Sequence, residues 1–74
     1  MDIDGLIADL DARGTIVGVD VFTDHIGIWY NNITGTKTEL DNIVLQYVSD
    51  TYTTLDSTLE NITGEGNRYK CRAK

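Results

Sequence analysis

The chain has 74 residues, one cysteine, one histidine, and twelve carboxylates against six lysines and arginines, for a net charge of −6. A single cysteine excludes an internal disulfide, and one cysteine with one histidine cannot complete a Cys/His zinc site within one chain. The acidic start is the reverse of a signal peptide, and no apolar run approaches the ~20 residues that span a bilayer, so we expect one cytoplasmic domain over residues 1–74.

A short amphipathic helix is predicted at the start of the chain. Apolar residues recur at helical spacing, at Ile3, Leu6, Ile7 and Leu10. Asp2 is a good N-cap, and Asp4 lies in the first turn, where the helix dipole favours anions. Gly14 is placed for the left-handed position that ends a helix.

Two antiparallel strands are predicted next, over residues 15–22 and 25–31, because apolar and polar residues alternate there without proline. A two-residue turn at Thr23-Asp24 would set the register. One face would then pair Val21 with Ile26, Val19 with Ile28 and Val17 with Tyr30, and the other Phe22 with His25, Asp20 with Gly27, Gly18 with Trp29 and Ile16 with Asn31.

A long helix is predicted from Lys37 to Ile62. Thr36 and Glu39 form a capping box, and a helical stripe of apolar residues continues to Ile62. Because threonine is a poor helix former, a break near Thr53-Thr54 into two shorter helices is the alternative.

The last seven residues, 68–74, carry four cations and no acid, whereas residues 1–67 carry a balance of −10. Tyr69, Cys71 and Ala73 alternate with the cations, which predicts a third strand, at a sheet edge where cations discourage further pairing. A disordered basic arm is the alternative. The fold class is therefore α+β, with the long helix packed on one face of the sheet.

No catalytic motif emerges, and we expect no enzyme activity, metal or cofactor. His25 lies beside the predicted turn. It could act as a general base oriented by Asp24 or Asp20, but the simpler interpretation is an exposed turn residue. Cys71 lies among cations that lower a thiol pKa, but a small apolar residue on the inner side of a strand is the simpler reading.

Two surfaces are candidates for binding a protein. The outer face of the hairpin carries Phe22 and Trp29, and aromatic residues are enriched at interface hot spots. The acidic surface resembles a phosphate backbone in charge and would be attracted to basic proteins while repelling nucleic acid, although salt adaptation alone would also produce such acidity. The predicted contact residues are Asp9, Asp11, Asp20, Phe22, Asp24 and Trp29.

The opening segment Met1-Asp2-Ile3-Asp4-Gly5-Leu6-Ile7-Ala8-Asp9-Leu10, followed by a hairpin and a helix, resembles small acidic phage-encoded anti-CRISPR inhibitor proteins. The basic tail and the threonine-rich helix are not part of that pattern. The resemblance implies an inhibitor in an infected host cell that occupies a basic nucleic-acid-binding surface of a defence complex. The alternative is a small structural or assembly protein that forms a homodimer through the hairpin sheet face.

Overall fold

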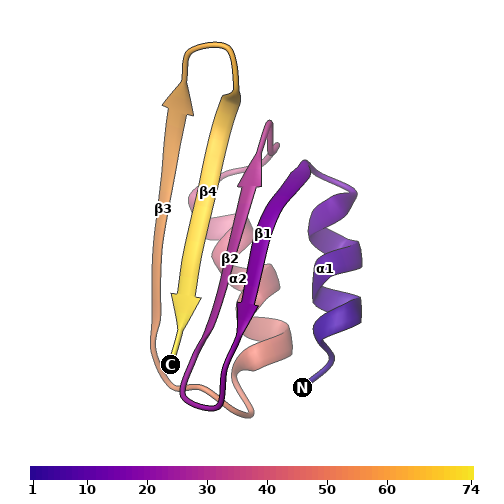
Figure 1. The fold of residues 1–74 in the computed structure, drawn as a ribbon, viewed down its shortest axis with the longest axis vertical. Helices are drawn as coiled ribbons and strands as arrows, with labels where there is room; N and C mark the ends of the chain where they lie inside the picture. The colour runs from indigo at the N-terminus through magenta and orange to yellow at the C-terminus, as the bar shows by residue number, and fades with distance from the viewer.

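The computed structural model describes all 74 residues and has the predicted α+β class, with two helices and one antiparallel sheet. The elements are α1 (Ile3–Asp11), β1 (Thr15–Val21), β2 (Ile26–Asn31), α2 (Lys37–Val48), β3 (Leu55–Ile62) and β4 (Gly66–Ala73). The strand order across the sheet is β1-β2-β4-β3. Both helices pack on one side of the sheet and leave the other side open (Figure 1).

The first helix begins as predicted but ends differently. The Asp2 side chain accepts a hydrogen bond of 2.9 Å from the Gly5 N–H, and Leu6 and Leu10 are fully buried. Gly14 does not have the positive φ that the sequence suggested. A Cβ there would lie 2.8 Å from the Ile33 Cα, so glycine is required by close packing and not by a left-handed cap.

The β1–β2 hairpin confirms the predicted register from Val21–Ile26 to Gly18–Trp29, and the Phe22 N–H donates to the His25 carbonyl at 2.9 Å. Beyond Gly18 the prediction is wrong, because a bulge at Val17 makes Ile16, not Val17, the partner of Tyr30. The extra residue changes which side chains face the core, and Val17 is left 60% exposed.

The predicted long helix is wrong beyond Val48. Residues 49–54 connect α2 to the sheet, and β3 occupies the second half of the predicted helix. The break does fall near Thr53-Thr54, but the segment after it is a strand and not a second helix. Leu55 and Leu59 fit a helical stripe and also, with Ser57 between them, a strand of period two; pairing with β4 decides in favour of the strand.

The tail is a strand, as predicted, but it lies between β2 and β3 and not at an edge. A turn at residues 62–66, where the Glu65 N–H donates to the Ile62 carbonyl at 3.0 Å, joins β3 to β4, and β4 pairs with β2 on its other side. Gly64 and Gly66 take φ values of 83° and 70°, which allow β3 to fold back on β4 as a tight hairpin. The basic residues therefore lie in the interior of the sheet plane.

The core lies between the sheet and the helices. Its buried side chains come from every element except β1 and β3 and from two connecting segments: Leu6, Leu10, Ile26, Ile28, Tyr30, Ile33, Leu40, Val44, Val48, Tyr52, Tyr69, Cys71 and Ala73. Neither helix has the length and apolar character needed to cross a bilayer.

Candidate interaction surfaces

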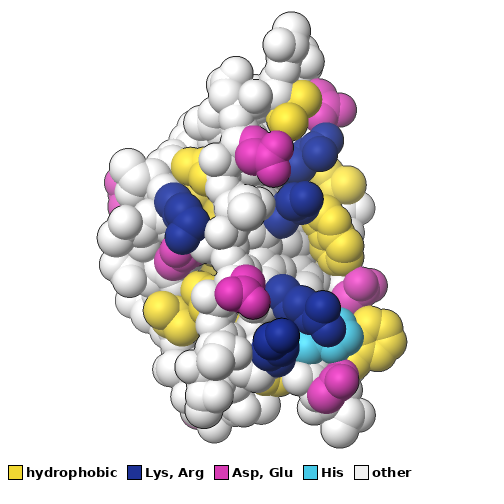
Figure 2. Space-filling model, turned by 90° about the vertical axis from the view of Figure 1, so that its left-hand side faces the viewer, with side chains coloured by type: hydrophobic (Ala, Val, Ile, Leu, Met, Phe, Trp, Pro, Cys, Tyr) yellow, Lys and Arg dark blue, Asp and Glu magenta, His cyan; other side chains and the backbone are white.

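The open face of the sheet carries a row of cations on its central strand. Tyr69, Cys71 and Ala73 point into the core, so the alternating residues Arg68, Lys70 and Arg72 point to the open side. Figure 2 shows cations running down this side of the molecule, with the histidine near the lower end and hydrophobic side chains along the right-hand margin. We call this surface the open face.

Two of these cations have no ionic partner. Arg68 pairs with Glu65 at 2.8 Å, and Arg13 and Lys37 pair with carboxylates on the helices. Lys70 and Arg72 form no ion pair, although the chain has twice as many carboxylates as cations. Their side chains are thus free to meet an anion.

A hollow of about 220 Å³ lies between β2 and the end of β4. Gly27 leaves its centre open, because a Cβ there would meet only the Cys71 carbonyl oxygen, at 3.7 Å. The walls are Trp29, His25 and Arg72. The indole leans over Gly18, where a Cβ would lie 3.4 Å from its Cε3 atom. The lining therefore combines an indole and two cations with the carboxylate of Asp20.

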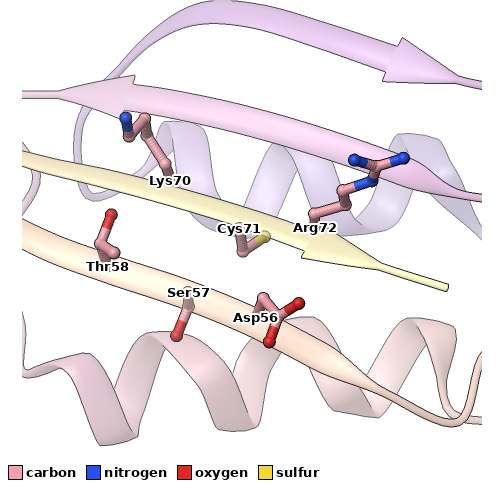
Figure 3. A pocket seen from close by; sticks show the side chains of 6 residues that line it. All are labelled: Asp56, Ser57, Thr58, Lys70, Cys71 and Arg72. Carbon is pink, nitrogen blue, oxygen red and sulfur yellow. The ribbon is translucent and has the colours of Figure 1, made fainter.

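A second, shallower hollow of about 450 Å³ lies on the other side of β4, against β3. Lys70 and Arg72 extend away from each other, so the strand between them is open, and Ser57 points toward α2 (Figure 3). The two hollows share both cations. The β4 cations therefore form a ridge between two depressions.

The thiol between those cations is not activated. Cys71 is 7% exposed on the core side of β4, and burial raises its pKa to about 12. The thiol is therefore protonated at neutral pH, and the simpler reading of this residue holds. No three histidine, cysteine or acidic side chains come together as a metal site.

The histidine is held at the hairpin turn. Its Nδ1 lies 2.9 Å from the Asp24 carboxylate, and its ring packs on Phe22 with centroids 4.9 Å apart. The hydrogen bond with His25 is the main cause of a lowered Asp24 pKa, and Arg72 contributes through its charge. Asp24 orients the imidazole, which lines the smaller hollow together with Asp20 and Arg72.

The opposite side of the molecule is formed by the two helices and is mostly acidic. We call it the helical layer, residues 1–14 and 36–50. Seven of the twelve carboxylates belong to it, against two cations, for a balance of −5: Asp2, Asp4, Asp9, Asp11, Glu39, Asp41 and Asp50, with Arg13 and Lys37.

One carboxylate of this layer is tied into the core. Asp41 accepts a 2.6 Å hydrogen bond from the buried Tyr69 hydroxyl and one of 3.0 Å from Lys37. Burial alone would raise the pKa of Asp41, but hydrogen bonds from Tyr69, Ser57 and Lys37 outweigh it and hold the pKa below its ordinary value.

The six predicted contact residues do not form one surface. Asp20, Phe22, Asp24 and Trp29 lie together on the β1–β2 hairpin, three of them exposed and Trp29 half-buried. Asp9 and Asp11 lie on α1, in the helical layer, where Asp9 accepts a hydrogen bond from Tyr47. Lys70 and Arg72 were missed because the tail was predicted at an edge, away from Trp29; in the structure Lys70 is directly opposite Trp29.

No family model matches this chain, and no characterised protein or solved structure is significantly similar to it.

Proposed function

We propose that this protein acts by binding another protein, as an inhibitor that places its helical layer on a basic nucleic-acid-binding surface of a host defence complex. The observation that carries the proposal is the segregation of charge: a balance of −5 on one side of the molecule. A surface of one sign attracts an oppositely charged cleft over a long range and repels nucleic acid. The proposed class is that of the anti-CRISPR inhibitors.

The shape of the molecule supports this proposal. Its extents are 34 × 20 × 20 Å, a short rod about as thick as a nucleic-acid duplex. A duplex carries one charge per ~1.7 Å, or roughly 20 over this length, against twelve carboxylates here. The charge density of the protein is therefore lower than that of the nucleic acid it would displace, and part of the affinity has to come from non-ionic contacts of the helical layer, such as those of the exposed Leu45.

The test is a DNA-binding assay with a panel of purified CRISPR effector complexes, each with its guide RNA and labelled target DNA. Three forms of the protein are compared. The helical variant carries Asp4→Asn, Asp9→Asn and Asp11→Asn. The sheet variant carries Asp20→Asn, Asp56→Asn and Glu60→Gln. Each variant changes the net charge by the same three units, on opposite sides of the molecule.

We expect the wild-type protein to block target binding by at least one complex, with a concentration for half inhibition that rises steeply with salt. The helical variant should be roughly twentyfold weaker, since three lost surface pairs at about 0.2–1 kcal/mol each total about 1.8 kcal/mol at the centre of that range. The sheet variant should stay within about threefold of wild type. No inhibition of any complex, or an equal loss in both variants, would contradict the proposal.

A further inference from the structure

The two edges of the sheet differ in chemistry. β3, at one edge, presents alternating polar residues, among them Asp56 and Glu60. β1, at the other edge, has Asp20 as its only charge. Exposed apolar side chains follow β1 and the residue after it: Ile16 (38%), Val17 (60%), Val21 (52%) and Phe22 (53%). Charged side chains normally protect an edge strand from pairing with another chain, and β1 carries only one charged side chain.

The main chain of β1 is also unpaired on its outer side. The Phe22 N–H bonds to His25, and hydrogen-bonded pairs alternate along an antiparallel ladder, so Asp20 and Gly18 also bond to β2. The N–H and C=O groups of Val19 and Val21 therefore point outward, and no loop or helix bonds to them. The large exposure of Val17 and Val21 shows that α1 does not cover this edge.

We propose that β1 pairs with β1 of a second copy of this chain, antiparallel and centred on Val19, to form a continuous eight-stranded sheet. In this register Val19 and Val21 would use their outward groups, with Val21 opposite the partner's Val17. Val17 and Val21, which are 60% and 52% exposed, would then cover one another across the interface.

Charge favours this register. Centred on Val19, each Asp20 lies opposite Gly18 of the other copy, and no like charges meet. Centred on Asp20, the two carboxylates would face each other directly, which is destabilising. The bulge at Val17 shortens the regular edge, so the affinity is modest.

The experiment is sedimentation equilibrium from micromolar to millimolar concentration, on wild type and two variants. Val21→Pro removes one outward N–H and leaves the bonds to β2 intact, and proline is tolerated at such edge positions. Val21→Thr is the matched control, because it keeps the N–H and a β-branched shape. Circular dichroism and the fluorescence of Trp29, the only tryptophan, verify that each variant is folded.

We expect a reversible dimer for wild type and Val21→Thr, and a dissociation constant at least roughly tenfold larger for Val21→Pro, because two main-chain hydrogen bonds are lost per dimer. A wild-type protein that stays monomeric to about 1 mM would overturn the inference, and so would a dimer unaffected by Val21→Pro. If Val21→Pro does not fold, mixed isotope labelling of wild type decides, since only the proposed register brings the Asp20 and Gly18 α-protons of different copies together. Neither outcome depends on the proposed inhibition.

Discussion

The helical layer and the open face lie on opposite sides of the same four strands and differ in electrostatic character. The helical layer has a balance of −5, whereas the rest of the chain, which forms the sheet, sets five carboxylates against four cations, for a balance of −1. The four tail cations alternate with apolar residues over the last seven positions of the sequence, yet three of them, Arg68, Lys70 and Arg72, lie on a central strand of the sheet. The difference teaches that position along the chain does not give position on the surface.

The largest expected difference in stability is between substitutions of two neighbouring residues of β4. Tyr69 is fully buried against the helices, and Lys70 is exposed on the open face. Tyr69→Ala should lower the free energy of unfolding by about 3–5 kcal/mol, because it leaves a cavity and unpairs Asp41. Lys70→Ala should change it by less than about 0.5 kcal/mol. Urea denaturation of both variants measures this; equal effects would show that the two faces are assigned wrongly.

A smaller effect depends on pH. The folded-state pKa of Asp41 lies below its ordinary value of 3.8. The ionised Asp41 carboxylate therefore stabilises the fold fully above about pH 5, and this stabilisation is lost as the pH falls through 3.8 toward the folded-state pKa. Asp41→Asn should lower the free energy of unfolding by about 1–3 kcal/mol at pH 7, and this loss should become smaller as the pH falls below 3.8.

The control for Asp41 is Asp56→Asn on the open face, where the carboxylate has no ion pair. This variant should change the free energy of unfolding at pH 7 by less than about 0.5 kcal/mol. A difference between Asp41→Asn and wild type that stayed constant from pH 7 to pH 2 would contradict the proposed role of the Tyr69 hydrogen bond.

Signals between residues close in sequence predicted about half of the fold correctly. The Asp2 and Thr36 caps, the start of both helices and most of the β1–β2 register follow from residues close in sequence. The strand β3 does not, because Leu55 and Leu59 suit either period and only pairing with β4 selects the strand. The bulge at Val17 likewise depends on which residue can face the core beside Tyr30.

The sequence predicted which kinds of surface the molecule presents, but not which residues form each surface. Alternation in residues 68–74 correctly separated Tyr69 and Cys71 from the cations. Placing those cations beside Trp29 required the strand order, which follows from the turn at Gly64 and Gly66 and from non-local pairing. Asp9 and Asp11, which were predicted to support the hairpin contacts electrostatically, lie on α1 on the other side of the sheet.

The most direct test of the central proposal is amide hydrogen exchange of this protein, free and bound to the effector complex that it inhibits. Residues exposed on α1 and on the outer side of α2 should become protected, and β4 should change little. Protection confined to β4 and Trp29, with α1 exchanging as in the free protein, would show that the open face and not the acidic helical layer contacts the target.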